Sequence, residues 1–135
     1  MSCKPSQVFL LLALLAGAPS HASAMEPLQA SVCDIQAEPV TFDGKEVVVR
    51  GQVYAGVDVT NISDPRCPGH AVQLNVANRI SGHRDIRSFE RGLRVYGMRA
   101  VVTVTGRFQA KAPTHPFPMP AIDVHAVRSV VFEAK

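Results

Sequence analysis

The run EVVVRGQVYAGVDV at 46–59 limits the folds open to this chain more than any other feature. Apolar or small residues occupy its odd positions, and mostly polar residues occupy the even ones. A period of two places the two sets on opposite faces of a β-strand, so the run predicts a long, half-buried strand. Gly51 or Gly56 would allow that strand to bend or coil. The FDGK sequence at 42–45 predicts a turn ahead of it, because Asp-Gly supplies a positive φ angle.

Four further segments predict strands, at 60–63, 70–77, 99–109 and 121–133. In the last three, apolar residues alternate with polar ones, and we expect the following side chains to point inward: Val72, Leu74 and Val76; Ala100, Val102, Val104 and Phe108; Ile122, Val124, Ala126, Val130 and Phe132. The segment 111–120 contains four prolines and predicts a loop, since proline cannot donate to a strand ladder.

Two segments have the helical period instead. The segment 27–39 spaces Leu28, Val32 and Ile35 as on one helical face and meets Pro39, so it predicts a short helix that carries Cys33. The segment 83–97 predicts an amphipathic helix. Its apolar face would hold Ile86, Phe89, Leu93 and Tyr96, and its opposite face would hold Arg84, Arg87, Arg91 and Arg94.

Three strands, a helix and two more strands follow one another in the order of an OB-fold, a small Greek-key barrel of five strands. We therefore expect an all-β fold with short helices, one at the N-terminal side of the barrel and one between the third and fourth strands. Another small β-barrel or a β-sandwich is the alternative that this pattern leaves open.

The first residues resemble a secretory signal peptide. Lys4 is followed by an apolar run from Val8 to about Ala18 and by the small residues Ala22-Ser23-Ala24. We expect cleavage before Met25, which leaves 25–135 as one OB-fold-like domain in the periplasm or outside the cell. An uncleaved anchor is the alternative. Cleavage would also remove one basic residue, so the formal net charge of +3 falls to a value too small to indicate nucleic acid by itself.

The cleaved chain would retain two cysteines, Cys33 and Cys67. In an oxidising compartment these predict a structural disulfide between the first helix and the turn SDPRCPGH at 63–70. A reactive thiol pair or a bridge between two chains is the alternative.

No motif for an enzyme or a resident cofactor occurs. The sequence has no G-x-S-x-G, no H-E-x-x-H and no phosphate-binding glycine loop, so we expect a non-enzymatic protein without catalytic residues or cofactors. Asp123 and His125 on an expected strand, with His115 from the neighbouring loop, would be a minor metal-binding alternative. A solvated strand face that carries a histidine is the favoured explanation of these residues, and we expect no metal.

The stretch at 31–70 resembles a group of secreted bacterial OB-fold proteins of largely uncharacterised function. The resemblance lies in Cys33 within the first helix, Phe42-Asp43-Gly44-Lys45, the V-x-V-x-G strand ending at Gly51, and Cys67-Pro68 after Ile62-Ser63-Asp64. More distantly, the chain is similar to periplasmic OB-fold proteins linked to stress tolerance and small-ligand binding. The resemblance implies a fold and a compartment, and no catalytic residues.

Together these features predict a binding module for a small molecule or an oligosaccharide-like ligand. An OB-fold binds on the outward face of its second and third strands and the flanking loops, where we expect the ligand-binding residues Tyr54, Arg66, Gln73, Asn75, His115 and Phe117. The sequence has no tryptophan, and the outward faces offer few aromatic rings on which bases could stack, which argues against nucleic acid.

An alternative function rests on Arg84, Arg87, Arg91 and Arg94. Guanidinium groups bind phosphate and carboxylate, so this helix face could dock an anionic surface or a partner protein of the cell envelope. The favoured explanation of these residues is the solvated side of a helix that closes the barrel, because every surface helix needs a polar face. Both a monomer and a dimer are compatible with the sequence.

Overall fold

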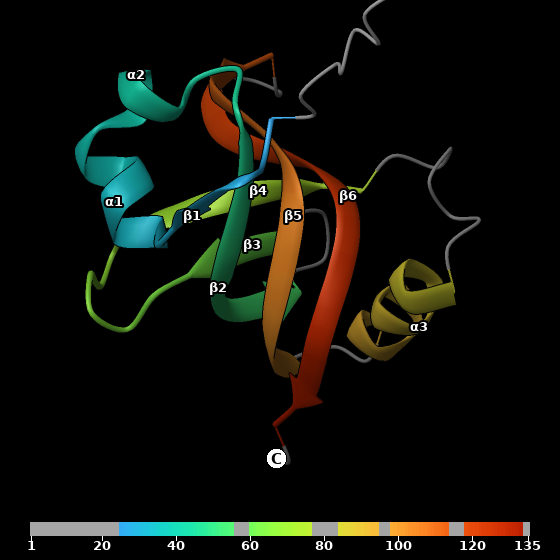
Figure 1. Cartoon of the computed structure of the whole chain (residues 1–135). Coiled ribbons are helices and arrows are strands. Elements are labelled where there is room, and N and C mark those ends of the chain that lie inside the picture. Colours follow the sequence, from blue (N-terminus) through green and yellow to red (C-terminus); the bar gives the residue numbers. More distant parts are fainter. Residues whose placement is uncertain (1–24, 56–59, 77–83, 95–97, 114–117, 134–135) are drawn as a thin grey trace, which may run out of the picture.

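The computed structural model describes residues 25–55, 60–76, 84–94, 98–113 and 118–133 (Figure 1). Six strands and three short helices make up this part of the chain. They are β1 (Leu28–Ala30), α1 (Val32–Ala37), α2 (Pro39–Phe42), β2 (Glu46–Ala55), β3 (Thr60–Ser63), β4 (Ala71–Asn75), α3 (Arg84–Leu93), β5 (Arg99–Ala112) and β6 (Met119–Phe132).

Five of the strands form a closed barrel. The strands follow the order β2-β3-β4-β6-β5, and β5 pairs back onto β2 along the register from Glu46↔Arg107 to Tyr54↔Arg99. All pairs of the barrel are antiparallel except β4–β6, which is parallel. With α3 between the third and fourth barrel strands, this is the five-stranded Greek-key barrel of the OB-fold, as the sequence predicts.

Strand β2 holds the barrel together because it has three neighbours. One of its edges pairs with β5, and the other pairs first with β1 and then with β3. The strands come very close at Gly51, where a Cβ atom would lie 2.6 Å from the carbonyl oxygen of Ser63. A glycine is therefore needed where β2 approaches β3. This close approach accounts for the glycine in the middle of the predicted strand. Residues 56–59 of the predicted strand lie outside the described part of the chain.

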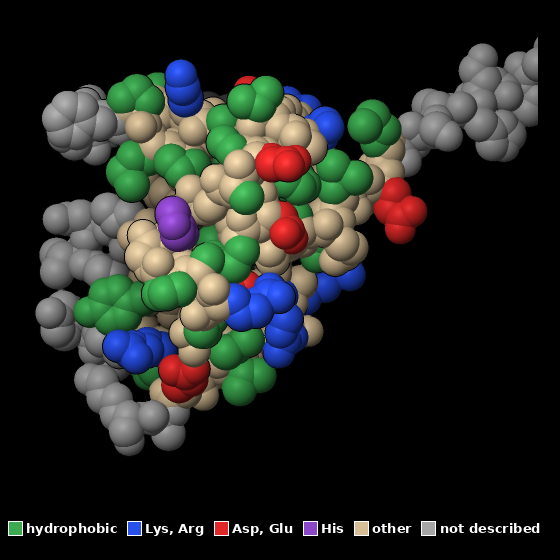
Figure 2. Space-filling model, turned by 90° about the vertical axis from the view of Figure 1, so that its left-hand side faces the viewer, with side chains coloured by type: hydrophobic (Ala, Val, Ile, Leu, Met, Phe, Trp, Pro, Cys, Tyr) green, Lys and Arg blue, Asp and Glu red, His purple; other side chains and the backbone are tan. Residues whose placement is uncertain are grey.

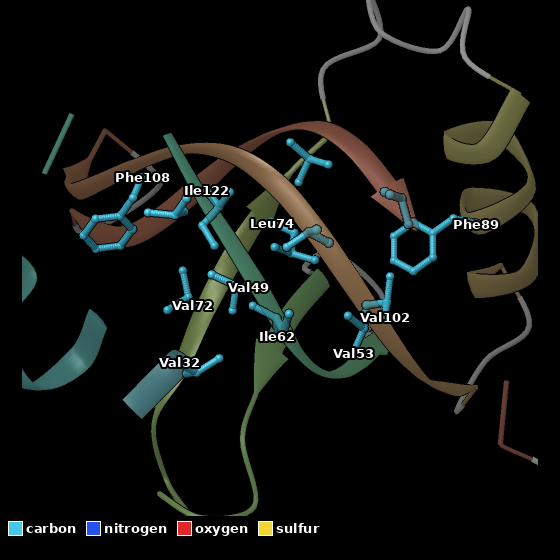
Figure 3. Packing of buried hydrophobic residues seen from close by; sticks show 14 of the residues in the cluster. Val32, Val49, Val53, Ile62, Val72, Leu74, Phe89, Val102, Phe108 and Ile122 are labelled. Atoms are coloured by element: carbon cyan, nitrogen blue, oxygen red, sulfur yellow. The ribbon is translucent and has the colours of Figure 1, made fainter. Parts of the chain in front are cut away.

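The barrel is filled by the apolar residues that alternate along the strands. Val49, Val53, Ile62, Val72 and Val102 are all completely buried. Figure 3 shows them between two aromatic rings, with Phe89 of α3 at one end of the cluster and Phe108 of β5 at the other. The predicted inward faces of 70–77 and 99–109 are thus confirmed for the described strands.

Helix α3 closes one end of the barrel with its apolar side. Ile86, Phe89 and Leu93 are buried, as the helical spacing predicts. Gly92 lies where α3 meets β6, and a side chain there would overlap the ring of Phe132. Glycine is an unfavourable residue inside a helix, but at this position it allows α3 to approach the barrel closely. His83 and Tyr96 of the predicted helix lie outside the described residues.

The predicted helix at 27–39 is wrong at both ends. Leu28 belongs to β1, which pairs in parallel with β2, and α1 begins only after Ser31. Ser31 and Asp34 form a capping box, in which each side chain accepts a hydrogen bond from the other residue's backbone N–H. Pro39 opens α2 as its first residue, because a first-turn N–H has no partner in a helix and its absence costs nothing.

The proline-rich loop predicted at 111–120 is shorter than expected. Strand β5 continues to Ala112, β6 begins at Met119, and these two residues pair with each other. Pro120 is tolerated near the start of β6 because the register shifts between Gln109 and Ala112, so the ladder is already irregular there.

Strand β6 does not keep one alternation along its length. Its register with β5 shifts near His125 and again near Ser129, which has a positive φ of 53°. Each such bulge adds a residue and changes which side chains point inward. The buried residue is consequently Val127, and the predicted inward positions of Ala126 and Phe132 are wrong: Ala126 is half-buried, and Phe132 is exposed at the edge beside α3.

The predicted disulfide is confirmed. Cys33 of α1 is bonded to Cys67 in the turn between β3 and β4, with 5.7 Å between the two Cα atoms. A hydrogen bond also joins α1 to the start of β4, since the Gln36 amide nitrogen donates to the carbonyl oxygen of Ala71. The turn at 42–45 is confirmed as well, with a φ of 74° at Gly44.

Candidate ligand-binding face

A row of three polar side chains crosses the outward face of β2, β3 and β4. Val53, Ile62 and Val72 point into the barrel, so their neighbours Tyr54, Asn61 and Gln73 point out. The antiparallel register pairs Tyr54 with Asn61 and Asn61 with Gln73. Two of the predicted ligand-binding residues, Tyr54 and Gln73, are thereby placed in one row, with Asn61 between them.

Asn61 is the member of the row that is not among the ligand-binding residues predicted from the sequence. Its side chain is half-buried, and its Oδ1 atom accepts no hydrogen bond from any residue in the described part of the chain. A buried amide oxygen without a donor costs about 1–3 kcal/mol. The sequence does carry a signal for this position, because Asn61 adjoins the inward Ile62 in a strand and must therefore point outward.

The third predicted residue on these strands, Asn75, belongs to a neighbouring network. Its amide nitrogen donates to Oδ1 of Asp123 over 3.0 Å, and its Oδ1 accepts a hydrogen bond of 3.2 Å from Gln73. The other oxygen of Asp123 accepts a hydrogen bond from Gln109. The network continues the polar face across β6 and β5, and it holds Gln73 at the end of the row.

Tyr54 gives the row an aromatic surface. Its side chain lies across from Asn61 on one side and from Arg99 of β5 on the other, and 44% of the residue's surface is exposed. The row therefore combines one accessible ring, which offers an apolar surface, with two amide groups that can donate and accept hydrogen bonds.

Arg66 is not part of this row. It lies in the turn after β3, where Nε and Nη2 bind the carboxylate of Asp64, the shortest distance being 2.7 Å. These hydrogen bonds lower the pKa of Asp64 and raise that of Arg66. Arg66 was predicted as a ligand residue because its turn adjoins the third strand, but the turn folds against α1. The other two predicted residues, His115 and Phe117, lie outside the described residues.

The arginine residues of the alternative site are arranged as the helical period predicts. Arg84, Arg87, Arg91 and Arg94 are all exposed, on the side of α3 that faces away from the barrel. Among the described residues, no carboxylate lies within ion-pair distance of them.

The minor metal alternative finds no support in the described residues, which contain no group of three potential metal ligands from His, Cys, Asp and Glu. Asp123 is bound to Asn75 and Gln109, whereas Nδ1 of His125 lies 3.2 Å from Glu46. The two side chains therefore have different partners, Asp123 in the amide network and His125 at Glu46.

Comparisons with known proteins find a similarity in backbone structure only. No family model matches the sequence, and no curated protein matches it. A solved structure of OBody AM3L09 bound to hen egg-white lysozyme is similar, with 22% identity and a TM-score of 0.48 over 70% of this chain and 88% of that one. OBody AM2EP06 bound to hen egg-white lysozyme has 22% identity and a TM-score of 0.45 over 64% of this chain and 81% of that one.

Each helix in the described part of the chain is too short or too polar to span a membrane.

Proposed function

We propose that this chain is a non-enzymatic binding module of the periplasm or the extracellular space, and that it binds a neutral, hydroxyl-rich ligand such as an oligosaccharide. The observation that carries the proposal is the unpaired Oδ1 of Asn61 between Tyr54 and Gln73. Rotation about the terminal torsion of an asparagine is soft, so the amide can turn its oxygen toward a ligand that brings a donor. A sugar hydroxyl is such a donor.

The chemistry of the row favours an uncharged ligand. The exposed ring of Tyr54 offers an apolar face on which the C–H surface of a sugar can lie. The amides of Asn61 and Gln73 can each donate and accept, as hydroxyl groups require. None of the three residues of the row carries a charge, and the neighbouring cation Arg99 lies on β5, across from Tyr54.

The non-enzymatic part of the proposal rests on the same residues. Amides do not titrate, and the carboxylate of Asp123, which is the nearest acid in the network, has both oxygens hydrogen-bonded to amides. The compartment is supported by the signal-like segment at 1–24 and by the disulfide, because disulfides persist in oxidising environments.

The test is a titration of the disulfide-bonded protein, residues 25–135, with maltohexaose, cellohexaose and chitohexaose, followed by amide NMR spectra. We expect one of them to shift the amide signals of β2, β3 and β4. Both Tyr54→Ala and Asn61→Ala should weaken that binding about tenfold, which corresponds to about 1.4 kcal/mol. Gln29→Ala, an amide residue outside the row, is the matched control and should bind normally. Unchanged binding in Asn61→Ala, or no binding by any of the three, would reject this ligand class.

A second candidate function is supported by the arginine helix. Its four exposed guanidinium groups lack carboxylate partners among the described residues, and its apolar side is already used to close the barrel. Such a face suits an anionic surface or an acidic protein partner, held by electrostatic attraction alone. Replacing Arg87 and Arg91 with glutamate should abolish this binding and leave oligosaccharide binding intact. Only binding by the helix should weaken steeply with salt.

A further inference from the structure

A groove with polar and apolar lining residues lies on the outside of the barrel, and none of the row residues Tyr54, Asn61 and Gln73 lines it. It has a volume of about 420 Å³, and its lining residues come from β1, the start of α1, β2, β5 and the turn after β3. Figure 1 shows β1 running beside β2 in this region. Its polar lining residues are Gln29, Ser31, Asp34, Arg50, Arg66 and Thr103. None of them takes part in the polar row or its network.

Two guanidinium groups supply the positive side of the groove. Arg50 is exposed on the outward face of β2, opposite Thr103, and no carboxylate of the described residues lies within ion-pair distance of it. Arg66 uses Nε and Nη2 for Asp64 and retains Nη1 as a donor, and its side chain is 74% exposed. A carboxylate in the groove would therefore meet Arg50 without having to displace a protein partner.

Asp34 supplies the negative side. Its Oδ2 accepts hydrogen bonds from the backbone N–H and the hydroxyl of Ser31, at 2.9 and 2.7 Å. Its Oδ1 accepts none from any described residue. The bonds from Ser31 lower the pKa of Asp34, so the carboxylate is ionised at neutral pH.

The charges of the groove balance each other. Arg66 is neutralised by Asp64, which leaves Arg50 and Asp34 as one available cation and one available anion. On the face that carries α1, basic and acidic side chains are likewise interspersed (Figure 2). A ligand with a single charge would be attracted by one of these groups and repelled by the other, whereas a dipolar ligand is attracted by both.

We propose that this groove binds a zwitterionic amino acid or short peptide, with its carboxylate at Arg50 and its ammonium group at Asp34. The Thr103 hydroxyl and the Gln29 amide offer hydrogen bonds to a peptide backbone. The half-buried Ala30 and Val48 add apolar contact beside them. The site is independent of the proposed oligosaccharide face.

The experiment uses the disulfide-bonded protein and amide NMR titrations with alanine, dialanine and trialanine. Comparing the three lengths tells whether a free amino acid or a peptide spans the two charged groups. We expect at least one to bind with millimolar affinity and to shift the signals of Ser31, Arg50 and Thr103. N-acetylation and C-terminal amidation of the ligand should each weaken its binding about tenfold, because each removes one of the ligand's two charges.

Two conservative variants test the assignment of the charges. Arg50→Gln should abolish the difference between free and amidated trialanine, and Asp34→Asn should abolish the difference between free and acetylated trialanine. Asparagine can still accept from Ser31, so the start of α1 is preserved. The control Asn61→Ala should bind trialanine normally, and Arg50→Gln should bind the oligosaccharide normally, so that failure of one site is distinguished from failure of the other. Absence of binding by all three zwitterions, equal binding of the capped peptides, or unchanged binding in Arg50→Gln overturns the proposal.

Discussion

Removing the Cys33–Cys67 disulfide should lower the free energy of unfolding by an amount that the chain length of its loop determines. The two cysteines are 34 residues apart in sequence. In the loop-entropy model, a closed loop of this size restricts the unfolded chain by about 13 cal/mol/K, or about 4 kcal/mol at 25 °C. For a domain of about one hundred residues, this corresponds to a fall in Tm of about 15–20 °C.

The measurement compares the oxidised protein with the double variant Cys33→Ala/Cys67→Ala in urea unfolding and calorimetry. Because the bridge lies outside the barrel, we expect the variant to keep the barrel fold and its dispersion of amide signals. The slope of unfolding free energy against urea should increase, since the unfolded chain without a cross-link is more expanded and exposes more surface. The reduced wild-type protein is the matched control, and it should unfold at the same urea concentration as the variant.

Two results would refute this reasoning. A loss below about 1 kcal/mol would mean that the unfolded chain is already restricted between the two cysteines, so that the bridge removes little entropy. A loss of the barrel's amide dispersion in the variant would mean that the bridge holds the native packing of α1 and the β3–β4 turn, and the effect would then belong to the folded state.

Three other predictions concern packing and charge. Gly106→Ala should destabilise the fold by about 1–3 kcal/mol in urea unfolding, since its Cβ would overlap the main-chain carbonyl oxygen of Asp123 on β6; a neutral result would contradict the close approach of β5 and β6. Phe89→Ala should cost about 3–5 kcal/mol by the same assay, whereas the exposed Arg87→Ala should change stability by less than about 0.5 kcal/mol. Arg66 lowers the pKa of Asp64 below its ordinary value of 3.8, so the stability that Asp64 contributes is present above that value and is lost as pH falls through the folded-state pKa. Asp64→Asn should therefore be less stable than wild type at neutral pH, and the difference should shrink between about pH 5 and pH 2; a constant difference would show that the ion pair does not contribute.

The barrel strands could be predicted from sequence because most of them alternate without interruption. Val47, Val49 and Val53 in β2, and Val102 and Val104 in β5, follow a strict period of two, and each of them is buried. The alternation of buried and exposed residues is lost where a β-bulge adds a residue to one strand of a pair. The bulges near His125 and Ser129 reverse the face of β6, and they depend on how β6 fits its two neighbours, which no local pattern records.

The start of the helix predicted at 27–39 was wrong for a different reason. Leu28, Val32 and Ile35 have helical spacing, yet Leu28 lies in a strand because the edge of β2 next to Val47–Val49 is available for pairing. Pairing with a distant strand outweighs a weak local preference in so short a segment.

The candidate sites, too, were predictable only where they depend on local sequence patterns. Tyr54 and Gln73 could be placed on one face from alternation alone, but their joining through Asn61 follows from the register of three strands. The groove at Arg50 and Asp34 brings together residues from β1, α1, β2 and the turn after β3, and only the folded arrangement shows that these charges face one space.

The position of β6 has a consequence for how the chain acquires its structure. The last strand in sequence lies between β4 and β5 and pairs with both. Until residues 119–132 are available, those two strands each have an unpaired edge, and the barrel core that contains Leu74 and Phe108 stays open to water. A chain that emerges N-terminus first, from a ribosome or from a translocation channel, therefore cannot fold segment by segment. It must wait for its final strand, and formation of these long-range pairs should make folding a late, cooperative and comparatively slow event.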